Sequence, residues 1–292
     1  MRASLKHKLK HKLKNHPKHQ PKNQQGFTLV ELVTVIVILG VLATGISSFL
    51  RFGTQSYTDA ADRDALLATA RFVVERLNRE VRNALPNSIR TIGVNNQCLE
   101  FVPIDKSVIY LDIPVAPEAA RDSVEVIMLD SVLSSTTQYV AVYALNSNDI
   151  YNKASGVIEA FVSVVKASEQ PKLSTINFSP EVLFKAESPT ERLYFIQSPV
   201  SYCVEGQAIY RYQGYGFGET DSYNNDGMPV GTDDTQKVLM AEYVDNYSSD
   251  IVPFQTSPAT LQRNSLALIR LKFALNLEEI VFNNEIQVPN VP

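Results

Sequence analysis

A continuous apolar run constrains this chain more than any other feature. Residues 27–50 read FTLVELVTVIVILGVLATGISSFL and contain a single charged residue, Glu31. A helix of this length rises about 36 Å, enough to cross a hydrocarbon core of about 30 Å. A buried core helix is the soluble alternative, but an apolar run longer than about 18 residues is typical of a membrane span. We therefore expect residues 27–50 to form a transmembrane helix.

The segment before this run is strongly basic. Residues 1–26 hold eight of the 27 Lys and Arg residues and all four histidines, and no Asp or Glu. A basic tail can bind nucleic acid, but a basic flank beside an apolar helix is also the usual cytoplasmic anchor of a membrane span. We expect residues 1–25 to be disordered and cytoplasmic, and everything after Arg51 to be exported.

The other 266 residues have the opposite charge. They carry 19 Lys and Arg against 31 Asp and Glu, a formal charge of −12, and no histidine. If residues 1–26 are removed, this composition excludes histidine-dependent triads and histidine metal ligands, and it disfavours nucleic acid as a partner. The glycine-rich segment 210–218 lacks G-x-G-x-x-G, and no helix pattern follows it. We predict a protein that is not an enzyme and has no cofactor.

The start of the apolar run carries a recognisable motif. The segment QGFTLVE, residues 25–31, resembles the processing motif of type IV prepilins and type II secretion pseudopilins. The resemblance implies that a membrane-embedded prepilin peptidase cleaves between Gly26 and Phe27 and methylates the new amino group of Phe27. The leader would be lost while the apolar helix stays in the protein. An ordinary secretory signal, cleaved near residues 43–47, is the alternative.

Glu31 is the second candidate functional residue. A charge at this depth costs roughly 2.5–3.5 kcal/mol on insertion scales, and such residues mark function. It lies four residues after Phe27, on the same helix face. The resemblance implies that its carboxylate pairs with the N-terminal ammonium of a neighbouring subunit during assembly.

The helical pattern continues beyond the membrane. Apolar residues recur at steps of three and four, and Pro86 follows the last of them: Leu66, Ala70, Val73, Leu77, Val81 and Leu85. The sequence predicts one helix from residue 27 to about residue 85. These residues form an apolar stripe along the helix, which a coiled-coil partner could cover. We favour packing on the chain's own β-sheet.

From residue 87 the pattern is typical of strands. Ten are predicted, separated by Pro, Asn, Ser and Asp: 97–104, 108–113, 124–129, 139–145, 157–165, 192–199, 208–212, 238–244, 265–276 and 279–288. The expected fold class is α+β and pilin-like, with a long N-terminal helix packed on an antiparallel sheet domain. The expected domains are a leader (1–26), a transmembrane half-helix (27–50), an amphipathic half-helix (51–86) and a β-rich periplasmic domain (87–292).

The two cysteines, Cys98 and Cys203, both lie in the exported part. An even count in an oxidising compartment predicts a disulfide, with two free thiols as the alternative. The acidic loop 221–234 offers a weak calcium candidate in Asn224, Asp226 and Asp233. With Gly227 at the sixth position of an EF-hand-like pattern, the first position would be Ser222 and not Asp. We favour a solvated loop and no metal. The aromatic residues of 210–218 could bind a sugar or a surface. We favour the interpretation that they pack at the end of a strand.

The resemblance also implies a function. It predicts a non-enzymatic minor pilin, larger than a typical major pilin, that primes or caps a fibre. Its partners would be the prepilin peptidase, other major and minor pilins, the inner-membrane assembly platform and inner-membrane lipid. The expected location is the inner membrane of a Gram-negative bacterium, with the N-terminus cytoplasmic, and then the pilus. A J-type minor pseudopilin of type II secretion and a tip adhesin that binds a surface or glycan are the alternatives.

Overall fold

The computed structural model describes residues 26–127, 132–152, 155–167, 172–217, 223–230, 235–247, 250–259 and 263–289. By its internal contacts the chain divides into two units, residues 1–56 and residues 57–292. One helix, α1 (Leu29–Arg82), contributes to both. The fold of the second unit is mostly antiparallel β-structure packed on the later half of α1, so the predicted α+β architecture is confirmed.

α1 begins two residues later than predicted. The hydroxyl of Thr28 accepts a hydrogen bond from the Glu31 amide at 3.3 Å, and its carbonyl accepts one from the Leu32 amide at 3.1 Å. Thr28 is therefore the N-cap, which satisfies an amide that has no partner within the helix. Gly26 and Phe27 precede the helix.

The helix also ends three residues earlier than predicted, at Arg82. The Leu85 amide donates to the Val102 carbonyl at 2.7 Å, and the Ile104 amide donates to the Asn83 carbonyl at 3.0 Å. Pro86 disfavours helical geometry at the residue before it. Residues 83–85 therefore pair with a later extended segment instead of completing another helical turn.

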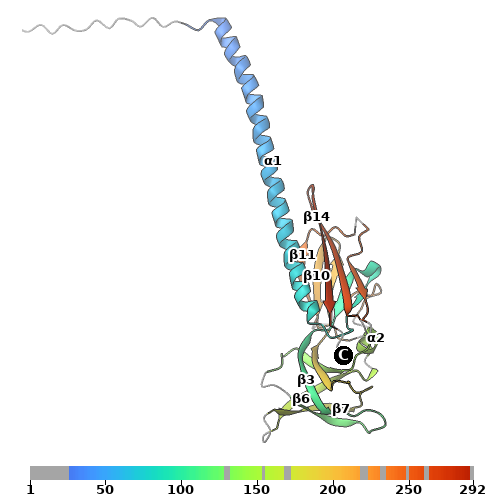
Figure 1. The fold of residues 1–292 in the computed structure, drawn as a ribbon. Coiled ribbons are helices and arrows are strands. Elements are labelled where there is room, and N and C mark those ends of the chain that lie inside the picture. The colour runs from blue at the N-terminus through green and yellow to red at the C-terminus, as the bar shows by residue number, and fades with distance from the viewer. Residues whose placement is uncertain are drawn as a thin grey trace, which may run out of the picture. The chain divides into compact units, whose positions relative to one another are not determined.

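Two sheets pack against one face of the later half of α1 (Figure 1). The first has the order β1-β2-β9-β10-β11, and the second has the order β12-β13-β14. The predicted stripe faces them, since Leu66, Ala70, Val73, Leu77 and Val81 are all fully buried. The strands are β1 (Arg90–Ile92), β2 (Cys98–Phe101), β9 (Val200–Glu205), β10 (Ala208–Gln213), β11 (Gln236–Glu242), β12 (Phe254–Ser257), β13 (Ser265–Leu275) and β14 (Glu278–Val288).

The segment between β2 and β9 forms a closed barrel, which the sequence did not predict. Its strand order is β3-β4-β7-β6-β5-β8, and every pair is antiparallel. The strands are β3 (Ile104–Asp112), β4 (Arg121–Ile127), β5 (Thr137–Val142), β6 (Ile158–Lys166), β7 (Leu173–Val182) and β8 (Arg192–Gln197). The barrel has its own core and lies at the C-terminal end of α1 (Figure 1).

The predicted strands correspond to ten of those found, but β1, β7, β9 and β12 were missed, as were the short helices η1 (Val94–Asn96) and α2 (Ser147–Tyr151). β7 closes the barrel between β4 and β6. Its inward residues include Ser174 beside Ile176 and Phe178, and it contains Pro180, which weakens the alternating apolar pattern. The alternation of apolar and polar residues in β7 is therefore too weak to predict this strand from the sequence.

Candidate functional site

The motif residues lie at and just before the N-terminus of α1. Phe27 is exposed and non-helical, and Glu31 is the third residue of the helix. Thr28 and Glu31 have the spacing of a capping box, T-x-x-E, and a carboxylate in the first turn interacts favourably with the helix dipole. The peptide bond between Gly26 and Phe27 lies in an exposed, non-helical segment.

The first half of α1 has no protein partner in the structure. Its described residues up to Ser56 are exposed although most are apolar, including Val33, Ile38 and Leu42. Within the described part of the chain, α1 is the one helix long and apolar enough to cross a membrane. An apolar surface of this extent is stable only in lipid or against other apolar helices. These features fit a membrane-anchored protein.

Cys98 and Cys203 form the expected disulfide. They lie opposite each other on β2 and β9, with their Cα atoms 4.0 Å apart. β2 leads into the barrel and β9 leads out of it. The bond therefore joins the two strands at the base of the inserted barrel. Both cysteines are fully buried, under Tyr212 and Tyr215.

A buried ion pair next to the disulfide was not predicted from the sequence. Glu100 on β2 is fully buried and accepts hydrogen bonds from Arg90, Tyr215 and Tyr223. The Arg90 guanidinium also lies 3.5 Å from the centre of the Tyr151 ring, in α2 of the barrel. Burial lowers the pKa of Arg90, but the charge of Glu100 outweighs this and raises it overall. The pair connects the sheet, the barrel and the loop that holds Tyr223.

A second ion pair holds α1 against the first sheet. Glu80 accepts hydrogen bonds from Arg76 of the same helix and from Arg211 on β10, both at 2.9 Å. Burial raises the pKa of Glu80, but the hydrogen bond from Arg76 and the charge of Arg211 outweigh it, so that the pKa lies below its ordinary value. The sequence shows the Arg76 to Glu80 spacing, whereas the pairing with Arg211 depends on tertiary structure.

The calcium candidates are only partly described. Asn224 is engaged within its own loop, where its amide oxygen accepts hydrogen bonds from the backbone amides of Asp226 and Met228. Asp233 lies outside the described residues. Within the described ranges, no group of three or more His, Cys, Asp or Glu side chains is arranged to hold a metal.

The aromatic residues after β10 do not form an open patch. Tyr215 and Phe217 are buried, Tyr215 donates to Glu100 at 2.8 Å, and Phe217 packs on the edge of Tyr139. The packing interpretation is therefore correct for these two residues. The burial of these rings accounts for the aromatic residues of the segment. Its glycines have a backbone reason, because Gly214 and Gly216 have positive φ angles.

Comparison with known proteins gives one match, to a family model that covers the N-terminal motif. Residues 21–47 match the family model for the prokaryotic N-terminal methylation motif. This match supports a protein of the type IV pilin and pseudopilin class, a structural subunit that is processed by a prepilin peptidase and assembles with other pilins. No curated protein and no solved structure matches the chain.

Proposed function

We propose that this protein is a minor pilin of a type IV pilus, a structural subunit that primes or caps the fibre. The observation that carries the proposal is the methylation motif at residues 21–47, placed at the start of an exposed apolar helix whose later half is packed in a β-domain. Such a chain can remain in the membrane by its helix and enter a fibre by the same apolar surface.

In this proposal the leader, residues 1–26, is removed between Gly26 and Phe27, and Phe27 is N-methylated. Glu31 then selects a neighbouring subunit, because two opposite charges in hydrocarbon are tolerable when they meet. The β-domain lies in the periplasm of a Gram-negative cell until assembly. The barrel adds bulk at the end of α1, which favours a terminal position over the repeated lattice of a fibre.

The system that we propose is the mannose-sensitive haemagglutinin pilus, and the subunit is its O-type biogenesis protein. Three segments far from the motif resemble that protein: residues 193–206, 209–216 and 286–292. The first two include β9 and most of β10, next to the disulfide, and residues 290–292 lie outside the described part of the chain. The J-type minor pseudopilin of type II secretion is the second candidate, since it shares the bulky β-domain and the glutamate.

Processing tests the proposal directly. Intact-mass and N-terminal peptide analysis of the membrane protein should find a chain that begins with methylated Phe27. The variant Gly26→Arg should remain as the full precursor, while Gly53→Arg, the same change at an exposed helical glycine beyond the apolar run, should not block cleavage before Phe27. A mature N-terminus near Ser47 would contradict the proposal. Crosslinking of the membrane complex with mass spectrometry then separates pilus from secretion partners.

A further inference from the structure

β14 forms a long open edge of the second sheet (Figure 1). In the part of the chain that the structure describes, the closed barrel has no edge strand, and the two sheets have four: β1, β11, β12 and β14. β1 and β12 contain three and four residues, whereas β14 contains eleven. An edge strand carries unpaired backbone groups, so a long one is a template for pairing with another chain.

β14 also lacks the features by which edge strands usually avoid such pairing, namely bulges, lysine and proline. β11 has two of them, because its register against β10 shifts next to Tyr210 and because it contains Lys237. β14 contains no Lys, Pro or Gly, and it keeps one regular register against β13 along all eleven residues. Its backbone therefore presents a regular edge.

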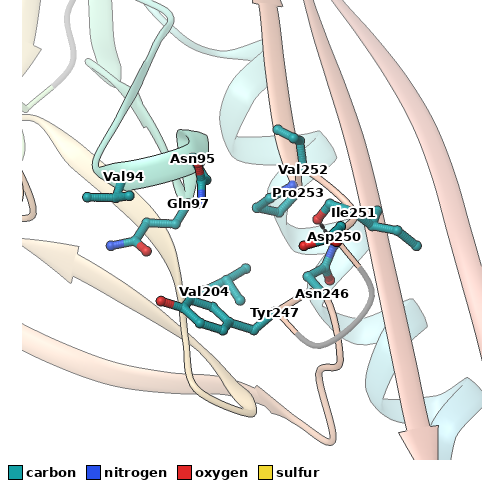
Figure 2. Close-up of a pocket in the computed structure, with 10 residues that line it drawn as sticks. All are labelled: Val94, Asn95, Gln97, Val204, Asn246, Tyr247, Asp250, Ile251, Val252 and Pro253. Atoms are coloured by element: carbon teal, nitrogen blue, oxygen red, sulfur yellow. Dashed lines mark hydrogen bonds between the residues drawn. The ribbon is translucent and has the colours of Figure 1, made fainter.

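Hydrogen bonds on the other side of β13 show which backbone groups of β14 are free. The Arg270 amide donates to the Pro253 carbonyl at 2.8 Å, and the Lys272 amide donates to the side chain of Asn246 at 3.0 Å (Figure 2 shows Pro253 and Asn246). Successive residues of a strand bond to opposite neighbours, so the odd-numbered residues of β13 bond to β14, where their partners are even-numbered. The N–H and C=O groups of the odd-numbered residues of β14 therefore point to the open edge: Glu279, Val281, Asn283, Glu285 and Gln287.

These five residues are accessible to an added strand. Their side chains are all exposed. Across the described residues, no backbone hydrogen bond from another segment reaches this edge. The edge can therefore take part in strand addition, a mode of recognition in which main-chain hydrogen bonds supply the affinity.

The charges of the edge restrict the partner. Glu279 and Glu285 lie on the same exposed face, while Arg270 and Lys272 lie one strand back on β13, with Lys272 bound to Glu279 at 3.0 Å. The two carboxylates are thus the charges nearest to an added strand. A second copy paired antiparallel about the middle of β14 would place Glu279 opposite or diagonal to its own Glu285, and like charges across a strand pair are destabilising. Basic side chains at these positions are favourable.

The other face of the edge is apolar. Ile280 and Phe282 are partly buried and pack on the core between α1 and the sheets. A strand beside them would cover their remaining exposed surface if it carried apolar residues at the opposite positions. The edge therefore suits a segment in which apolar residues on one face alternate with basic residues on the other.

We infer that the open edge of β14 binds an extended basic segment of another protein as an additional strand. Its main chain pairs with the five odd-numbered residues, and its basic side chains contact Glu279 and Glu285. The binding site does not involve the processing motif, and it does not depend on which fibre the protein enters.

Amide hydrogen exchange of the purified full chain in detergent tests whether the edge is open. The Val281 and Asn283 amides should exchange quickly, whereas the amides of Ile280 and Phe282, which bond to β13, should be protected. Slow exchange at Val281 in the free protein would overturn the inference.

A designed peptide then tests binding. It has nine residues, with Lys at its second and eighth positions, Val at its fifth and seventh and Thr elsewhere, and its ends are acetylated and amidated. Paired antiparallel, it places the lysines opposite Glu285 and Glu279 and the valines opposite Phe282 and Ile280. We expect a dissociation constant on the order of 1 mM or lower and slower exchange at Val281. A comparator with Glu in place of both lysines should bind roughly fivefold more weakly or worse.

Two variants decide the assignment. Val281→Pro removes an N–H that points to the open edge, a position where proline is compatible with a strand, and it should abolish binding. Val281→Thr keeps the N–H and should bind like wild type. Glu285→Lys should narrow or reverse the preference for the lysine peptide. Unchanged circular dichroism and an intact disulfide confirm that each variant folds.

Four results would overturn the inference. They are failure of the lysine peptide to bind, equal binding of the two peptides to wild type, binding that Val281→Pro leaves unchanged, and self-association of the chain that Val281→Pro abolishes. The last result, measured by sedimentation in the same detergent, would assign the edge to a second copy.

Discussion

Cys98 and Cys203 are direct cross-strand partners on β2 and β9, although 105 positions separate them in the sequence. Nearly all of those positions form the closed barrel, which begins just after β2 and ends just before β9. The disulfide therefore closes the base of an inserted module. Tyr215, which packs on the buried disulfide, also donates a hydrogen bond to the buried Glu100.

Removal of the disulfide should lower stability. Closing a loop of about 100 residues contributes up to about 4.7 kcal/mol by the chain-entropy estimate, and less where the unfolded state is compact. The double variant Cys98→Ser, Cys203→Ser should therefore unfold at a lower urea concentration, as followed by circular dichroism. Wild type treated with reductant while unfolded should show the same shift. An unchanged midpoint in both would contradict a stabilising role.

Loss of the Glu100 charge should destabilise the region around the disulfide. Glu100→Gln leaves Arg90 partly buried without a counter-charge, which we expect to cost up to about 3 kcal/mol in the free energy of unfolding. The double variant Arg90→Met, Glu100→Gln removes the stranded charge and should recover part of that loss. A double-mutant cycle by urea unfolding measures the coupling, and additive effects would show that the pair is not coupled.

Glu80 should make stability depend on pH. Its folded pKa lies below the ordinary value of 4.5, so its contribution is present at neutral pH and is lost as the pH falls through the folded pKa. Glu80→Gln should lower the melting temperature at pH 7, and the difference from wild type should shrink in acid. Glu75→Gln, at an exposed position of the same helix, is the matched control and should show no such trend.

The buried stripe of α1 should carry much of the stability of the second unit. Leu77→Ala removes a fully buried side chain between the helix and the sheets, which typically costs about 2–5 kcal/mol. Phe72→Ala removes a larger but half-exposed side chain from the other face and should change stability by no more than about 0.5 kcal/mol. Equal effects in thermal unfolding would contradict the observed helix orientation.

Glu31 should matter for assembly and not for folding. Glu31→Leu removes a charge that is costly in hydrocarbon, so insertion and protease resistance should be unchanged or slightly improved. If Glu31 pairs with the N-terminal ammonium of a neighbouring subunit, as proposed, the variant also removes that partner, and incorporation into sheared fibres should fall. Glu31→Gln should be partly defective, because it keeps an acceptor without the charge. Equal incorporation of wild type and Glu31→Leu would show that this carboxylate does not select a partner.

The local sequence pattern was sufficient to predict the helix and to identify the processing motif. The apolar run of residues 27–50 and the stripe from Leu66 to Val81 are periodic over many residues, so their signal adds up along the chain. The motif at Gly26 and Phe27 is contiguous in sequence, and a chain with two cysteines permits one internal pairing. These features depend on residues that are close together in the sequence, so the sequence alone contains the information that determines them.

Tertiary structure decided the features that depend on pairing between distant segments. The barrel requires β7, whose apolar alternation is interrupted by the buried Ser174 and by Pro180, and its closure depends on strand register that no single segment encodes. Glu100 has no sequence signal, because its partners are at positions 90, 215 and 223. Burial and charge pairing between such segments exist only after the chain has folded, so composition and periodicity carry no trace of them.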